Sequence, residues 1–276
     1  MEVNVAKVLD QLQDYGTRAQ KSIRKEGQVN RKTLVQIYEI QTPEEAALMT
    51  ALGVDHVGAV LVSTEKARDP VIRETVAAVR RLGVVSSVIP LFSDFPAVSE
   101  ALETLRPDII HFCDDLVDRA GRSLDPAPFL ALQQNVRERF PKVQIMRSIP
   151  IALPGQARRV DTLGIAAAFA PLSDWFLTDT WLGGSEGEPV SGFIGITGKT
   201  CDWPTAAALV KASPVPVILA GGLGPENASA GISAVRPAGI DSCTRTNARD
   251  ESGRPIRFKK DPARVAAFVA EAGRIG

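Results

Sequence analysis

The stretch at residues 216–227, PVILAGGLGPEN, is the most informative part of this 276-residue chain. A short apolar run leads directly into two adjacent glycines, Gly221 and Gly222, and a helix start follows. Glycines at such a junction let backbone N–H groups approach an anion closely, and a helix N-terminus favours negative charge. A tight turn that needs positive φ is the alternative explanation. The stretch therefore indicates an α/β fold with a phosphate-binding turn after one strand.

Outward from this stretch, apolar runs rich in Val, Ile and Leu alternate with helical segments. The expected strands are 34–40, 56–62, 84–91, 108–113, 143–149, 175–179, 215–220 and 239–243. The expected helices are 43–52, 70–82, 95–105, 126–140, 155–169, 203–211, 225–235 and 261–274. Because one α/β barrel usually takes about 250 residues, this pattern predicts a closed (β/α)8 TIM barrel over residues 33–276. In barrels, the loops after the seventh and eighth strands commonly form a phosphate site.

An extension over residues 1–32 precedes this pattern. Its apolar side chains recur at helical spacing, at Val5, Val8, Leu9, Leu12 and Tyr15. This spacing predicts an extra N-terminal amphipathic helix. A lid over the bottom of the barrel is favoured, and a homodimer contact is the alternative.

Charge and hydropathy exclude several classes of partner. Lys and Arg together number 32, as do Asp and Glu, and no basic stripe is present to neutralise a nucleic-acid backbone. No window is apolar over the roughly 18 residues that a membrane span requires, and the N-terminus has no basic region followed by an apolar core. We therefore expect a cytoplasmic protein without nucleic-acid or membrane partners.

Cysteine and histidine usage excludes a metal centre. The three cysteines, Cys113, Cys201 and Cys243, are widely separated and form no CxxC pair, which favours reduced thiols. Only two histidines, His56 and His111, are available. We therefore expect no bound metal. His111 and Arg147 are interpreted as hydrogen-bonded groups inside the barrel.

Two motifs carry a family resemblance. The stretch ILAGGLGPENA, together with GITGKTCDW at residues 195–203, resembles the phosphoribosylanthranilate isomerase family, whose seventh strand and loop read very like the first and whose upstream loop reads GGTGKTFDW. Ile196 and Cys201 are departures from the second motif. Gly239-Ile-Asp241 and Lys260-Asp261 follow in the family's order, so the resemblance covers residues 34–276 and is most specific from Asp179 onward. A Walker A loop is excluded because Phe193 stands where its first glycine is required.

The resemblance implies an Amadori rearrangement, in which a sugar-phosphate ring opens and a proton transfer gives a ketose. That chemistry needs an acid and a base on opposite sides of the sugar. The family's acid matches Asp179. Its base is a Cys in a KICGIT-like segment, and this chain has Gln36-Ile-Tyr-Glu-Ile-Gln41 there, with Tyr38 at the Cys and Glu39 at the following Gly. The catalytic candidates are therefore Asp179, Tyr38 and Glu39.

The resemblance also implies residues that bind the substrate. Arg245 replaces a glycine in the family's SSGVE-like phosphate segment, where this chain has Cys243-Thr-Arg-Thr-Asn247. An arginine could bind a phosphate through two hydrogen bonds from its planar guanidinium. The alternative is that Arg245 is an ordinary surface residue. In the second strand loop, Arg68 or Lys66 could replace the family's carboxylate-binding arginine. The candidates for binding phosphate or substrate are Gly198, Lys199, Gly221, Gly222, Thr244, Arg245 and Arg68.

These residues predict an isomerase for a phosphorylated sugar derivative with an altered substrate and no cofactor. A non-catalytic barrel that binds a sugar phosphate is the first alternative, because Tyr38 replaces the family's base. A lyase or aldolase that uses Lys199 as a Schiff base is the second, although such a lysine needs fixed, desolvating surroundings.

Overall fold

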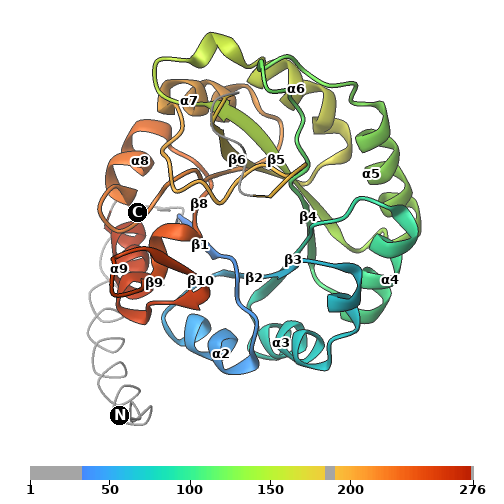
Figure 1. Cartoon of the computed structure of the whole chain (residues 1–276), viewed down its shortest axis with the longest axis vertical. Coiled ribbons are helices and arrows are strands. Elements are labelled where there is room, and N and C mark those ends of the chain that lie inside the picture. The colour runs from blue at the N-terminus through green and yellow to red at the C-terminus, as the bar shows by residue number, and fades with distance from the viewer. Residues whose placement is uncertain (1–32, 184–189, 275–276) are drawn as a thin grey trace, which may run out of the picture. The chain divides into compact units, whose positions relative to one another are not determined.

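Eight parallel strands form a closed barrel in the computed structural model, which describes residues 33–183 and 190–274 (Figure 1). The strands are β1 (Leu34–Ile37), β2 (His56–Leu61), β3 (Val85–Pro90), β4 (Ile109–Phe112), β5 (Gln144–Ala152), β6 (Trp175–Trp181), β7 (Val217–Leu219) and β8 (Gly239–Ser242). The barrel closes by pairing of β1 with β8. The predicted TIM barrel is therefore confirmed. The predicted N-terminal helix lies outside the described residues.

Helices surround the barrel between successive strands (Figure 1). They are α2 (Pro43–Ala51), α3 (Pro70–Arg81), α4 (Phe95–Leu105), α5 (Ala127–Arg139), α6 (Thr162–Phe169), α7 (Trp203–Ala212), α8 (Ala228–Val235) and α9 (Pro262–Gly273). None of the helices in the described part of the chain is long and apolar enough to cross a membrane.

Side-chain caps fix where most of these helices begin. Thr42, Asp69, Asp94, Asp202 and Asp261 each accept a hydrogen bond from a backbone N–H of the following first turn, and a proline stands in that turn. The helix predicted at 155–169 begins later, at Thr162, because Asp161 caps it by accepting from the N–H of Gly164.

A small antiparallel hairpin after β8 was not among the expected elements. A 3₁₀ turn at Thr244–Thr246 leads into β9 (Asn247–Arg249) and β10 (Pro255–Lys260), which pair with a register shift. Phe258 of β10 has a positive φ of 59°. The hairpin lies beside the end of β1, because it contacts Glu39 there.

Buried side chains fill the interior of the barrel. Inward-facing residues of the strands and strand ends form one buried cluster, which consists of Tyr38, Ile109, Met146, Leu177, Ile218 and Ala220. Arg147 was expected inside the barrel, but Met146 takes the inner position and strand alternation turns Arg147 outward. Its guanidinium lies against the rings of Phe112, Phe129 and Phe169.

Candidate active site

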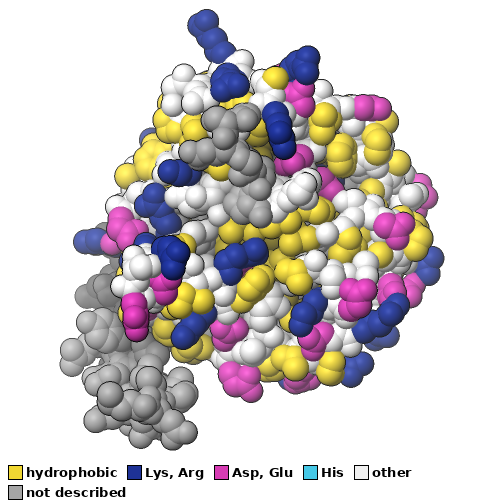
Figure 2. All heavy atoms as spheres, viewed as in Figure 1, with side chains coloured by type: hydrophobic (Ala, Val, Ile, Leu, Met, Phe, Trp, Pro, Cys, Tyr) yellow, Lys and Arg dark blue, Asp and Glu magenta, His cyan; other side chains and the backbone are white. Residues whose placement is uncertain are grey.

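A pocket of about 710 Å³, including its open mouth, lies where the strands end. Its lining comes from β2, β3, β4, β6 and β8 and from the segments that follow β1, β4, β6, β7 and β8. The carboxyl end of the strands is the face on which barrels carry their sites. Figure 2 shows hydrophobic side chains gathered at the centre of this face, with charged ones around them.

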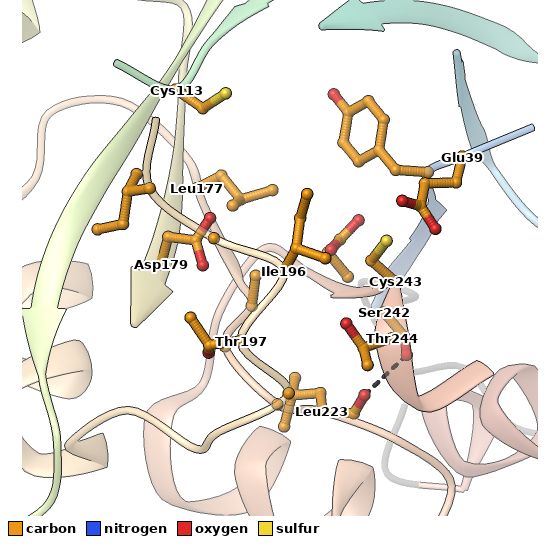
Figure 3. Close-up of a pocket in the computed structure, with 18 of the residues that line it drawn as sticks. Glu39, Cys113, Leu177, Asp179, Ile196, Thr197, Leu223, Ser242, Cys243 and Thr244 are labelled. Carbon is orange, nitrogen blue, oxygen red and sulfur yellow. Dashed lines mark hydrogen bonds between the residues drawn. The ribbon is translucent and has the colours of Figure 1, made fainter. Parts of the chain in front are cut away.

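Asp179 reaches this pocket from β6, two residues before the strand ends (Figure 3). Its Oδ1 accepts a hydrogen bond from the N–H of Thr180 at 2.9 Å. The loop after β6 returns over the carboxylate at Gly195, where φ is 117° and a Cβ would lie 2.5 Å from Oδ2 of Asp179. Only glycine can therefore stand at this position of the GITGKTCDW motif.

The loop that covers Asp179 is tied to the end of β4. The N–H of Ile194 donates to the carbonyl of Cys113 at 2.9 Å, and the N–H of Asp115 donates to the carbonyl of Gly192 at 3.0 Å. Asp114 lies between these contacts and forms a buried ion pair with Arg147 at 2.7 Å. This pair therefore fixes the loop that carries Ile194 and Gly195.

Tyr38, at the position of the family's base, is locked into the barrel interior. Its hydroxyl lies 2.5 Å from Oγ of Ser87 and 2.9 Å from Nδ1 of His111. Its ring occupies the space that a side chain at Gly58 would fill. Burial raises the pKa of Tyr38 well above its ordinary value, with a smaller opposing effect from the Ser87 hydrogen bond. The phenol is therefore neutral near pH 7 and is a poor base.

Glu39 is buried and fully engaged by the hairpin. Its carboxylate accepts from Nε of Arg257 at 2.7 Å, from Nδ2 of Asn247 at 3.2 Å and from the N–H of Phe258 at 3.3 Å, and Lys260 Nζ lies 4.0 Å away. Burial raises the pKa of Glu39, but Lys260 and Arg257 outweigh that effect and hold the pKa below its ordinary value. Glu39 thus connects β1 to the hairpin as an ionised anchor.

Asp241 is a pocket residue to which sequence reasoning assigned no role. It lies on β8 with only 6% of its surface exposed, opposite Gln36 of β1, whose Nε2 donates to its Oδ1 at 3.3 Å. Burial raises its pKa to about 7, against the Gln36 hydrogen bond and the charge of Lys260. A carboxylate near the end of an otherwise apolar barrel strand was the signal available in the sequence.

The glycines after β7 are required by the turn and by packing. Gly221 and Gly222 have φ of 84° and 59°, and a Cβ on Gly222 would lie 2.5 Å from the carbonyl carbon of Lys199. Gly221 likewise packs against Thr180 and Cys201. The tight-turn explanation is therefore confirmed, and it also brings the loops after β6 and β7 together at the pocket.

Several predicted binding residues meet at one end of the pocket. Gly198, Gly221, Gly222, Thr244 and Arg245 all line it. Nε of Arg245 donates to the carbonyl of Gly198 at 3.3 Å, which places its guanidinium between two loops.

Two other predicted binding residues do not reach this end. Lys199 is exposed and does not line the pocket. Arg68 is also exposed and forms a two-bond contact with Glu100, at 2.5 and 2.8 Å, outside the pocket lining. Within residues 33–183 and 190–274, no group of three or more His, Cys, Asp or Glu could hold a metal ion.

Two residues that line the pocket have a backbone conformation that usually belongs to glycine. Glu39 has φ of 65° and Ile196 has φ of 61°, and both replace glycines of the family motifs. A left-handed conformation costs a residue with a Cβ roughly 1–2 kcal/mol. Ile196 lines the pocket and points into it between Asp179 and Cys243 (Figure 3). Strained residues of this kind cluster at functional sites.

The chain is similar to known proteins. No family model matches the chain. An N-(5'-phosphoribosyl)anthranilate isomerase of Methanothrix thermoacetophila is 33% identical over 136 residues, which span 49% of this chain and about half, 52%, of that relative. One of Methanosarcina acetivorans is 26% identical over 249 residues, or 87% of this chain and 93% of that one.

Solved structures share the barrel. Phosphoribosyl anthranilate isomerase from Thermotoga maritima matches with a TM-score of 0.62 at 19% identity, over 87% of this chain and 98% of that one. A phosphoribosyl anthranilate isomerase in complex with reduced 1-(o-carboxyphenylamino)-1-deoxyribulose 5-phosphate matches with a TM-score of 0.60 at 18% identity, over the same shares. These structures show the common fold. Together with the two motifs, the relatives that match over most of the chain support its assignment as a distant member of the phosphoribosylanthranilate isomerase family.

Proposed function

We propose that this chain is an isomerase for a phosphorylated sugar amine, with Asp179 as the general acid and Asp241 as the general base. One observation carries the proposal. Two carboxylates, on β6 and β8, line a single pocket whose end is formed by the Gly221–Gly222 turn and Arg245. The family membership supplies the reaction class.

The rearrangement needs two proton transfers. Asp179 protonates the ring oxygen, so that the ring bond at C1′ breaks and the amine nitrogen's lone pair forms an iminium. Asp241 then removes the C2′ proton, whose bonding electrons neutralise the iminium and give an enolamine, which tautomerises to the ketose. A base works best with a pKa near the working pH, and a pKa of about 7 suits Asp241 to this step.

The remaining pocket groups have supporting roles in this proposal. The Gly221–Gly222 turn, Thr244 and Arg245 bind the phosphate, because they contribute backbone groups and a cation at one end of the pocket. Tyr38 forms part of the hydrogen-bonded floor below the sugar, since its hydroxyl is already engaged by Ser87 and His111.

A non-catalytic sugar-phosphate-binding barrel is the second candidate. The engaged state of Tyr38 and Glu39 favours it, because neither residue has a carboxylate or hydroxyl free to take a substrate proton. The lyase alternative has no comparable support, because Lys199 is exposed and a Schiff-base lysine needs desolvation.

Substitution of each carboxylate tests the proposal. The substrates are phosphoribosylamines formed from ribose 5-phosphate and a panel of amines, and NMR in D₂O follows exchange and loss of the C2′ proton. Asp179→Asn and Asp241→Asn should each lower kcat by about a hundredfold or more and change KM less. Asp125→Asn is the matched control, because Asp125 is exposed and an asparagine can keep its contact with the N–H of Ala127.

Three other outcomes would count against the assignments. A rise in KM alone would make Asp179 a binding residue. Unchanged constants in Asp241→Asn would leave the base unassigned. Binding of ribose 5-phosphate without turnover of any amine would favour the non-catalytic barrel.

A further inference from the structure

A second groove adjoins the pocket on the β2 side. Val60 lines both cavities, and the groove continues over Val62, Val71, Ile72 and Phe258. Val62 and Val71 are 48% and 47% exposed, which makes them two of the few large apolar side chains on the described surface. A ligand that leaves the pocket past Val60 therefore meets an apolar surface.

The hairpin holds one wall of this groove in place. The N–H of Phe258 donates to the buried carboxylate of Glu39 at 3.3 Å, and the Arg257 guanidinium carbon lies 4.7 Å from the centre of the Phe258 ring. Because these contacts fix the backbone and the ring before any ligand arrives, the apolar wall is preorganised.

The charged side chains that line the groove are paired with each other. Lys66 and Asp69 both line it, and their side chains form an ion pair at 2.8 Å. Arg68, the other cation of this loop, is held by Glu100 in a two-bond contact. A carboxylate entering the groove would therefore meet Asp69 as well as Lys66, and would have to displace that pair.

We propose that this groove binds the non-sugar part of the substrate and prefers an uncharged apolar group, such as an unsubstituted aromatic ring, over a ring that bears a carboxylate. The barrel order supports this placement. The phosphate end lies at β7 and β8, the groove lies at β2, and β1 stands between them in the barrel order, so that a ligand that reaches both crosses the pocket that Asp179 and Asp241 line. The inference rests on the proposed function for the orientation of the substrate.

Calorimetry with non-reacting analogues tests the groove without turnover. The probes are 1-phenylamino-1-deoxyribitol 5-phosphate, its o-carboxyphenylamino counterpart, and ribitol 5-phosphate. We expect the phenylamino compound to bind about tenfold or more tightly than either of the others, because it buries a ring without bringing a charge beside Asp69. Equal or tighter binding of the carboxylate compound would overturn the preference, and equal binding of all three would overturn the subsite itself.

Two variants and one control variant sharpen the measurement. Asp69→Asn frees Lys66 while an asparagine can still cap α3, so the carboxylate compound should gain affinity relative to the phenylamino one. Asp94 caps α4 in the same way, so Asp94→Asn is the matched control and should change the affinity of neither compound. Val62→Asn, at an exposed position, should weaken the phenylamino compound about fivefold or more and leave ribitol 5-phosphate unchanged. The groove assignment would be refuted if Asp69→Asn left the affinity ratio of the carboxylate and phenylamino compounds unchanged and Val62→Asn left the ratio of the phenylamino compound and ribitol 5-phosphate unchanged.

The outcomes also separate this inference from the proposed function. A preference for the phenylamino compound, with no turnover of any phosphoribosylamine, would support the groove and remove the isomerase. Turnover that depends on Asp179 and Asp241, with equal binding of the phenylamino and carboxylate compounds, would support the isomerase and overturn the preference of the groove.

Discussion

Asp241→Asn should change both the activity and the pH dependence of stability. The pKa of Asp241 rises from an ordinary value of 3.8 to about 7, which at about 1.4 kcal/mol per pKa unit corresponds to about 4 kcal/mol of disfavoured ionisation in the folded state. Asparagine has nearly the same shape, carries no charge, and can still accept a hydrogen bond from Gln36.

The direction of the effect follows from the raised pKa. Between its unfolded value near 3.8 and about 7, folded Asp241 keeps a proton that the unfolded chain has released, so the wild type loses stability as pH rises through this window. The asparagine side chain of the variant does not titrate and has no such dependence. The stability gain of the variant should therefore grow from under about 1 kcal/mol at pH 4 to about 4 kcal/mol at pH 8.5.

Urea unfolding of both proteins at several pH values measures this difference, and kinetics measure the function. If Asp241 is the base, wild-type kcat/KM should fall as pH drops below about 7, and the variant should lose about a hundredfold in kcat. A stability difference that stays constant with pH would refute the raised pKa. Full activity in the variant would refute the catalytic assignment even if the stability result held.

Four further outcomes are expected. Tyr38→Phe should cost about 1–2 kcal/mol in urea unfolding through its lost hydrogen bonds but keep kcat within about threefold, and a hundredfold loss would restore Tyr38 as the base. Arg245→Ala should weaken binding of inorganic phosphate about tenfold by calorimetry, and unchanged affinity would remove Arg245 from the site. Phosphoribosylanthranilate should show little or no turnover when its fluorescence loss is followed, and efficient turnover would contradict the altered site. Asp114→Ala should destabilise the fold by about 3–5 kcal/mol in thermal or urea unfolding, because it leaves Arg147 charged and unpaired in the core, and a loss under about 1 kcal/mol would contradict that.

The barrel could be predicted from local sequence patterns, namely the apolar runs and the helix-capping residues. Each strand buried on both faces must be a short apolar run, and each helix start needs a cap, so the eight βα units and the Thr42 start were predictable from neighbouring residues. The placement of Asp179 near a strand end, and of Gly221 and Gly222 in a turn after a strand, followed from the same periodicity.

The hairpin was not predictable in this way. Residues 247–260, NARDESGRPIRFKK, have few apolar side chains and no clear alternation. Its strands are positioned by the contacts of Glu39 with Arg257 and Asn247, more than 200 positions along the chain. A contact of that range leaves no periodic signal in the sequence.

The chemistry of the site was decided by tertiary structure. Sequence could align Tyr38 with the family's base and could locate Asp241 on the last strand, but the pKa of each depends on burial and on partners from other strands. Ser87 and His111 engage Tyr38, while Gln36 and the charge of Lys260 only partly offset the burial of Asp241. Residue type and order thus determined which groups reach the mouth of the barrel, whereas their protonation states depend on desolvation and distance, which exist only once the chain has folded.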